Sequence, residues 1–492
     1  MDVLSIRVCS SPYPLAWRKI NTTVTAFNFY PNSLSKKAAY ACFALTLSLA
    51  LPYAGNAQEE RHQLEEKTST ELEKLRPLTD AKNWDGAIAL LAGIKAKVGP
   101  ESFDMAVVTD VEAKIYLQKG DYAKVIPPLE TALRLTDKHK YLSDNSVQEL
   151  IYYLAQIYYQ EATATKVMAV QKQNFAKATS YLERWLTNTT KPIYDQSRQE
   201  AAVFYANLLY NQAVIDQEKI DMSLIQKAEV EVEKGLRMSA RPKEAFYLIL
   251  LAISQQKGNY PRLAELLEYL VKQSPAKKDY WAQLAGVYLN LAAQEKDEKV
   301  ARDYNTRAIL AIERAQALGF MKTPKDNYTL VGIYFNVGQF GRATEILHTG
   351  LNDGSIDSEL KNWELLAYSY QQVDRPLQAV EALKEGGKKF PKSGQLDYQI
   401  AQIYYALNKP EDSFKHLQIS VSKGNLEKPG PVFGFLGYVC WELGKLEEAI
   451  QAIDKAIASP DAQKDTQLPR LKQAVEEALR ERAAASSESP TL

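Results

Sequence analysis

The residue types that could carry catalysis are scattered along this chain. Its four histidines, His62, His139, His348 and His416, are isolated and show none of the spacings that bind a metal ion. The sequence has no C-x-x-C pair, no G-x-S-x-G nucleophile motif and no glycine-rich phosphate loop. The glutamate pairs 447–448 and 476–477 fit solvated helix faces better than catalytic carboxylates. We therefore expect a protein that is not an enzyme and that needs neither a metal nor another cofactor.

Tyrosine, asparagine and glutamine side chains recur on one face of several predicted helices, in a chain with 29 tyrosines. Tyrosine offers a large contact area at low rotamer cost, while glutamine and asparagine can pair with a peptide backbone. This face predicts a groove for a peptide segment with little charge; the alternative is that some of these rings are buried between helices and bind nothing. The candidate groove residues are Tyr152, Gln156, Tyr159, Asn207, Tyr210, Tyr328, Phe335, Gln371, Gln372, Tyr398, Gln402 and Tyr405.

The elements that must position this face show a repeat. Counted from Leu360, large residues stand at positions 4, 7, 11 and 24, small ones at 8, 20 and 27, and a proline at 32. These residues are Trp363, Leu366, Ala367, Tyr370, Ala379, Leu383, Gly386 and Pro391, and an earlier unit repeats the set with Trp281, Leu284, Ala285 and Tyr288. The pattern is that of the tetratricopeptide repeat (TPR), a helix–turn–helix of 34 residues that must stack on its neighbours to bury its apolar face.

Registering each unit on its small residues predicts an all-α TPR solenoid over residues 68–461. We expect a right-handed superhelix of about nine to ten repeats, the first of them degenerate. A lead-in segment precedes the array at 58–67, a capping helix follows at 464–485, and 486–492 reads as a disordered tail. The prolines at 127 and 128 should bend or shorten the helix in which they stand.

Positions 2, 5, 9, 12 and 13 of each first helix would line the groove. The absence of lysine and arginine from most of these positions argues against a groove that clamps a carboxylate.

Three repeats are longer than the pattern allows. Between positions 11 and 20 we expect nine steps, but Tyr158 to Ala178 spans 20, Leu209 to Ala228 spans 19 and Tyr288 to Ala308 spans 20. The extra residues have helical composition, which predicts that both helices of each hairpin are lengthened by about five residues. A plain longer turn is the alternative. We expect the hairpin tips, near 164–172, 215–221 and 294–300, to be ornaments specific to a partner.

Composition and the N-terminal region predict an exported protein. The formal net charge is zero, so nothing favours nucleic acid or anionic lipid as a partner. The apolar run 38–51 follows two lysines and precedes Gly55-Asn56-Ala57, which is typical of a secretory signal peptide within residues 1–57, cleaved near Ala57-Gln58. An uncleaved anchor is the alternative. Cleavage would leave Cys440 alone in a core position, with no disulfide and no span of the membrane.

Four stretches are more specific than the repeat. The segments 277–288 (KKDYWAQLAGVY), 350–354 (GLNDG), 361–367 (KNWELLA) and 423–430 (KGNLEKPG) resemble exported TPR proteins found beside the ExbB–ExbD–TonB energy-transducing system of Gram-negative bacteria. The resemblance implies a periplasmic scaffold that supports TonB-dependent uptake across the outer membrane. Its partners would be proteins or peptide segments of the TonB system or an outer-membrane receptor. An envelope assembly factor, a chaperone-like adaptor for outer-membrane proteins or polysaccharide export, is the alternative of a different class.

Overall fold

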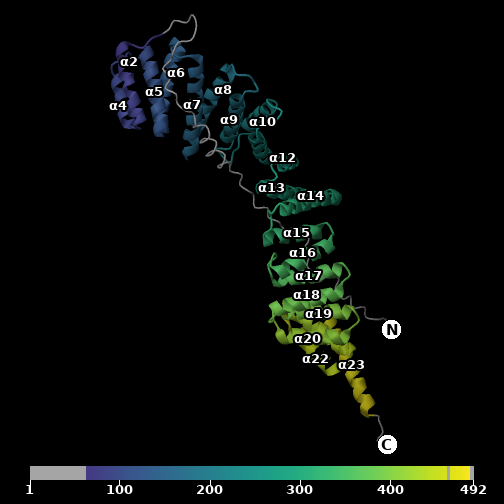
Figure 1. Cartoon of the computed structure of the whole chain (residues 1–492). Coiled ribbons are helices and arrows are strands. Elements are labelled where there is room, and N and C mark those ends of the chain that lie inside the picture. The colour runs from purple at the N-terminus through teal and green to yellow at the C-terminus, as the bar shows by residue number, and fades with distance from the viewer. Residues whose placement is uncertain (1–61, 463–465, 488–492) are drawn as a thin grey trace. The chain divides into compact units, whose positions relative to one another are not determined.

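The computed structural model describes residues 62–462 and 466–487, and its regular structure over these residues is entirely helical (Figure 1). The predicted signal peptide, its cleavage site, the first residues of the lead-in segment and residues 488–492 lie outside the described residues. None of the helices in the described part is long and apolar enough to cross a membrane.

The helices fall into two compact units. The described part of the N-terminal unit covers residues 62–266, and that of the C-terminal unit begins at Leu267, within helix α12. The helices up to this boundary are α2 (Glu66–Glu73), α3 (Leu75–Asp80), α4 (Trp84–Lys95), α5 (Phe103–Lys119), α6 (Ile126–His139), α7 (Asp144–Ala164), α8 (Met168–Asn188), α9 (Gln196–Ala213), α10 (Met222–Leu236), α11 (Glu244–Gln256) and α12 (Tyr260–Gln273).

The C-terminal unit continues the alternation of helix and short turn to the end of the described chain. Its helices after α12 are α13 (Lys278–Gln294), α14 (Glu298–Ala317), α15 (Pro324–Asn336), α16 (Phe340–Asp353), α17 (Leu360–Gln372), α18 (Pro376–Lys389), α19 (Gln395–Ala406), α20 (Pro410–Lys423), α21 (Pro429–Glu442), α22 (Leu446–Ala458) and α23 (Gln467–Ser487).

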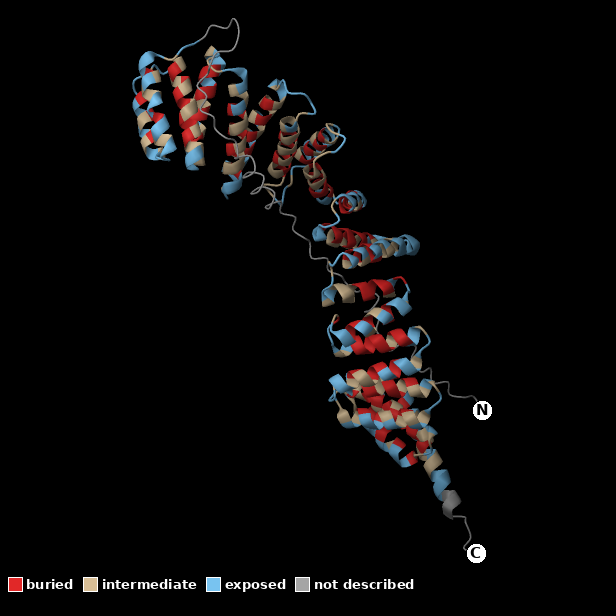
Figure 2. Cartoon of the chain, in the orientation of Figure 1, coloured by how far each residue is buried: buried red, intermediate tan, exposed pale blue. Residues whose placement is uncertain are grey.

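Within each unit, consecutive helices pair as hairpins and each hairpin stacks on the next. For example, α17 packs on α18, and α18 packs in turn on α19 of the following hairpin. Figure 2 shows buried residues concentrated where the helices of each unit face one another. The array therefore has a continuous core along each unit, as expected when no hairpin can bury its apolar face alone.

The small residues of the repeat lie where helices approach most closely. A Cβ atom added at Gly386 of α18 would lie 2.8 Å from Cγ of Trp363 in α17 and 3.2 Å from Cδ1 of Leu396 in α19. Glycine is thus the residue that lets three helices meet there. The other repeat-defining residues are buried, except Pro391, which is exposed just after the end of α18: Trp281, Leu284, Ala285, Tyr288, Trp363, Leu366, Ala367, Tyr370, Ala379 and Leu383.

The long repeats are extended in two different ways. Helices α7 and α8 have 21 residues each, and α13 and α14 have 17 and 20, against 13 and 14 in α17 and α18. The prediction that both helices lengthen is therefore confirmed for these two hairpins. In the third long hairpin, α9 ends at Ala213 and α10 begins at Met222. Part of the extra chain there forms a longer turn, which was the alternative prediction.

Helix ends follow local chemistry at two further places. Pro127 and Pro128 lie in the first turn of α6, where their missing N–H groups would have had no partner inside the helix. The α-helix begins only at Ile126, after a separate 3-10 turn at Tyr122–Lys124, and then runs for 14 residues. At the other end of the chain, α23 packs on α22 and buries Val475, with Leu471 and Leu479 beside it. Its opposite face is polar, as the last helix of a stacked array requires.

Candidate functional site: an aromatic face on the first helices of the hairpins

The face predicted on α19 is present as one stripe. Tyr398, Gln402 and Tyr405 follow one another at four and three residues, so they lie on the same side of the helix, and all three are half-buried. The rings of Tyr398 and Tyr405 also pack against the core shared by α19 to α22. Each ring therefore has one part that supports the fold and one part that water reaches.

Helix α21 adds rings that the sequence reasoning missed. Phe435 lies between the two tyrosines of α19, with its ring centre 6.3 Å from that of Tyr398 and 5.3 Å from that of Tyr405, both nearly edge-on. Tyr438 lies 5.9 Å from Tyr405, and Trp441 lies 6.0 Å from Tyr438. We call these five half-buried residues the ring cluster. Edge-to-face contacts at these distances are favourable.

A carboxylate borders the ring cluster. Tyr405 donates a hydrogen bond of 2.8 Å from its hydroxyl to Oε2 of Glu442, the last residue of α21. Burial is the largest cause that raises the pKa of Tyr405, and contacts with Tyr438 and Glu442 raise it further. The tyrosine therefore stays protonated and fixes the exposed carboxylate beside the rings. The spacing of Phe435, Tyr438 and Glu442, three and then four residues, could have revealed this stripe in the sequence.

The face continues on α15 and α17. Phe335 of α15 stacks on Tyr368 of α17 with ring centres 6.2 Å apart and planes 17° from parallel. Tyr328, two helical turns before Phe335, is half-buried. Tyr368 was missed, although it stands at position 9 of its repeat. Gln371 and Gln372 are exposed at the last turn of α17, so they lie on the rim of this face.

A buried carboxyl group separates the stripes of α17 and α19. Glu364 is 8% exposed, and Gln399 of α19 donates a 2.8 Å hydrogen bond to its Oε1 atom. Burial, followed by the nearby charge of Glu427, raises the pKa of Glu364 to about 7. The residue occupies a predicted groove position, but nothing in the sequence indicated that it would be buried.

In the N-terminal unit the corresponding residues bind mainly one another. The ring of Tyr159 packs 5.3 Å from that of Phe204, and its hydroxyl donates to Oδ1 of Asn207 at 3.1 Å. Tyr152 lies against Trp185 and Phe204, with centres 5.4 and 6.3 Å away. Burial raises the pKa of Tyr159 to about 12. These groups join α7 to α9, and their polar atoms are used inside the protein.

Two other predicted groove residues of this unit differ in exposure. Tyr210 is 6% exposed, so its ring belongs to the core and not to an open face. The helix position was read correctly from the repeat, but α11 of the next hairpin packs on α9, and its Gln256 contacts Tyr210. Gln156 is half-buried on α7. The open aromatic surface is therefore found in the C-terminal unit.

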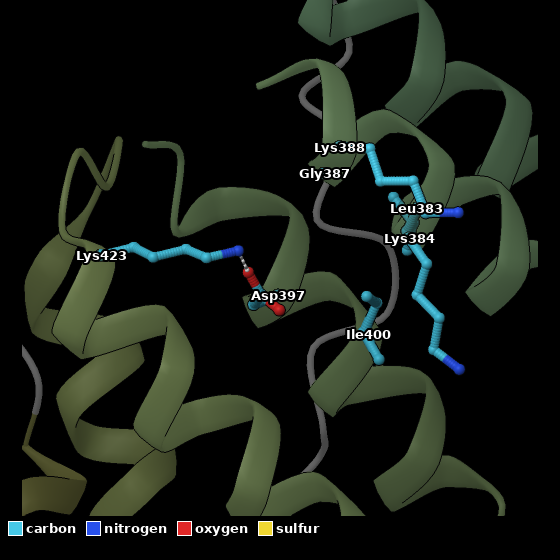
Figure 3. A pocket seen from close by; sticks show the side chains of 7 residues that line it. All are labelled: Leu383, Lys384, Gly387, Lys388, Asp397, Ile400 and Lys423. Carbon is cyan, nitrogen blue, oxygen red and sulfur yellow. Dashed lines mark hydrogen bonds and ion pairs between the residues drawn. The ribbon is translucent and has the colours of Figure 1, made fainter. Parts of the chain in front are cut away.

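The opposite side of α19 has a different character. Asp397 and Ile400 line a pocket of about 270 Å³ together with residues of α18 and α20 (Figure 3). Lys423 donates to Asp397 at 2.6 Å and His416 contacts the same carboxylate at 3.2 Å, which keeps the pKa of Asp397 low although burial opposes this. Figure 3 shows Lys384 and Lys388 pointing away from Asp397. The ion pairs tie α19 to α20, and we assign this pocket no ligand.

The described residues hold no group of three histidine, cysteine, aspartate or glutamate side chains placed to bind a metal ion. Cys440 is buried, and burial raises the pKa of its thiol to about 12, so it is a protonated core residue.

Comparisons with known proteins agree on the repeat. A tetratricopeptide repeat model matches residues 431–460, which form α21 and α22. No curated protein matches the chain. One similar solved structure is MamA, with 14% identity and a TM-score of 0.26 over 35% of this chain and 91% of that one. Another is MamA 41-end from Desulfovibrio magneticus RS-1, with 14% identity and a TM-score of 0.28 over 37% of this chain and 97% of that one. The APC/C hetero-tetramer Cut9-Hcn1 is also similar, with 12% identity and a TM-score of 0.26 over 83% of this chain and 90% of that one.

At these TM-scores we draw no conclusion about partners or function from the solved structures. The fold assignment rests on the repeat match at residues 431–460 and on the stacking of the hairpins in the described part of the chain. The chain is an all-α TPR solenoid.

Proposed function

We propose that this protein is a scaffold of the bacterial periplasm that binds protein segments through the aromatic face of α15, α17, α19 and α21 and supports TonB-dependent uptake. One observation supports the binding site most directly: half-buried rings follow one another on neighbouring first helices, from Tyr328 to the ring cluster. Rigid aromatic side chains of this kind are typical anchors of protein interfaces. Supporting evidence for the cellular role is the resemblance of segments 277–288, 350–354, 361–367 and 423–430 to TPR proteins found beside ExbB, ExbD and TonB.

The binding site is tested by removing two anchors. We expect the double variant Tyr398→Ala, Tyr405→Ala to weaken partner capture at least about thirtyfold, because truncation of an aromatic anchor commonly costs about 2 kcal/mol. Tyr194→Ala is the control, since this tyrosine is 73% exposed on a loop of the other unit. Both rings also pack on the core, so circular dichroism must first show that the double variant is folded. Unchanged capture by a folded double variant would place the binding site elsewhere.

The cellular role needs a separate test. A photo-reactive amino acid at position 402, between the two tyrosines, should cross-link the protein to ExbB, ExbD, TonB or a TonB-dependent receptor in living cells. Cross-links to assembly or export proteins of the envelope would favour the adaptor function instead. Inspection of the neighbouring genes distinguishes the same two functions.

A further inference from the structure

The ring cluster and Glu442 together have the composition of a site for a positively charged side chain. We propose that this part of the aromatic face binds an arginine or lysine of the partner segment, with its stem against the rings and its charge at Glu442. The inference rests on the proposed function and names the chemistry of the partner.

The charge distribution on the two helices carries this inference. Neither α19 nor α21 contains a lysine or arginine, and their only carboxylates are those of Asp397 and Glu442. Asp397 is buried on the other side of α19, where Lys423 and His416 neutralise it. Among the described residues, no lysine, arginine or histidine forms an ion pair with Glu442. The exposed face of this pair of helices therefore carries one uncompensated negative charge.

The rings strengthen the preference for a cation. The faces of tyrosine, tryptophan and phenylalanine rings carry negative electrostatic potential, and a cation within about 6 Å of a ring centre is attracted to it. Tyr405, Tyr438 and Trp441 are half-buried, so a part of each side chain remains accessible to a partner. The long apolar stem of arginine or lysine also suits such a surface.

The hydrogen bond from Tyr405 prepares the carboxylate. It occupies Oε2 of Glu442 at 2.8 Å and holds the group beside the rings, while Oε1 has no hydrogen-bond partner among the described residues. A guanidinium or ammonium group can donate to that oxygen and stack on a ring at the same time. A neutral or acidic side chain would gain neither contact, and an acidic one would be repelled.

The test uses a library of short peptides of random sequence displayed on phage and selected against the immobilised chain. We expect the selected peptides to share an arginine or lysine next to an aliphatic residue. Selection against Glu442→Gln should lose this enrichment, Glu442→Asp should restore it in part, and Glu411→Gln should leave it unchanged. Glu411 is an exposed glutamate in the first turn of α20, so its replacement removes the same charge from a different helix.

A direct measurement follows on a selected peptide. Replacing its arginine or lysine by norleucine should weaken binding about tenfold, since a cation on an aromatic face contributes on the order of 1–2 kcal/mol. The loss should shrink in Glu442→Gln. Enrichment without a basic residue, or basic enrichment that survives Glu442→Gln, would overturn the inference.

The outcomes also separate the inference from the proposed function. If neutral peptides are selected and the variant Tyr398→Ala, Tyr405→Ala loses them, the face binds peptides but has no preference for a cation. If the same peptides are selected by the wild type and by this folded double variant, both the inference and the proposed binding site are wrong. Selection of no peptide at all would likewise reject both.

Discussion

Two neighbouring glycines of α18 have opposite surroundings, and they give a matched test of the packing. A Cβ atom at position 386 would lie 2.8 and 2.9 Å from Cγ and Cβ of Trp363, whereas at position 387 it would meet nothing within 4 Å. We expect Gly386→Ala to lower the free energy of unfolding by roughly 1–3 kcal/mol through overpacking. Gly387→Ala should raise it by up to about 1 kcal/mol, because alanine favours the helix. Urea midpoints measure both, and equal shifts would contradict the close approach.

The raised pKa of Glu364 predicts a pH dependence of stability. In the unfolded chain its carboxyl group titrates near 4.5 and in the folded protein near 7, so folding favours the protonated form. The stabilisation that the Glu364 carboxyl group provides is complete below about pH 4.5. It falls as the pH rises from 4.5 to 7 and is absent above about pH 7. Glu364→Gln should therefore stabilise the protein at about pH 8, by at most about 3 kcal/mol, and change little at about pH 4. Thermal melts across this range, with Glu411→Gln as control, check the prediction; a constant difference would contradict it.

For single residues, the sequence predicted the side of the helix on which a residue lies better than it predicted the neighbours and the burial of that residue. The repeat register placed Tyr398, Gln402 and Tyr405 on one side of α19, where they lie. It could not predict that Phe435 would fill the space between the two tyrosines, because these contacts join residues 30 or more positions apart in the sequence. It also could not separate Tyr405, which remains half-exposed, from Tyr210, which is buried.

Neighbouring hairpins are joined by a recurring polar contact at the level of helices. A buried tyrosine of one first helix donates to a glutamate on the second helix of the preceding hairpin, and a lysine or arginine of its own hairpin approaches the same glutamate. The contact occurs as Tyr158–Glu130–Lys177, Tyr205–Glu183–Lys227, Tyr288–Glu268–Arg307 and Tyr334–Glu313–Arg342. All four tyrosine rings are buried, so their hydroxyl groups need these partners.

The contact of Tyr334 is the simplest to test. Its hydroxyl donates to Oε1 of Glu313 at 2.6 Å, while Arg342 lies 3.8 Å from that atom. We expect Tyr334→Phe to lower the free energy of unfolding by about 1 kcal/mol, since only the hydrogen bond is lost. Combined with Glu313→Gln, the two effects should not add, because both act on one contact. Tyr194→Phe, on an exposed ring, is the control; additive effects would show that the contact contributes little.

The α7–α8 hairpin has both a packed part and a free tip. Ala162 and Phe175 are buried, so the inner part of the extension belongs to the core. Val167 and Met168 beyond them are 58% and 43% exposed. Replacing residues 163–171 by a short turn should therefore keep a cooperative melt and change the free energy of unfolding by less than about 1 kcal/mol. Loss of cooperativity, followed by circular dichroism, would show that the tip is required for folding. Helical composition predicted the extension, but not where its burial ends.

For the whole molecule, contacts that join only nearby helices imply that a destabilising substitution affects only the repeats around it. Each helix with substantial contacts touches helices that are its first or second neighbours in the chain. We expect Gly386→Ala to reduce hydrogen-exchange protection in α17, α18 and α19 and to leave α5 to α8 unchanged, because stability in such arrays depends on each repeat and its adjacent interfaces. A uniform loss of protection along the chain would show that the array unfolds as one cooperative unit.

The order of these contacts also bears on how fast the chain reaches its fold. A helix finds its partners within the preceding or following few dozen residues, so only short loops must close before apolar surface is buried. Loop closure is the entropic cost that slows proteins whose contacts join distant segments. Each hairpin can thus dock as soon as the one before it has formed, while the rest of the chain is still unstructured. Folding can advance along the sequence in step with the emergence of the chain from the ribosome.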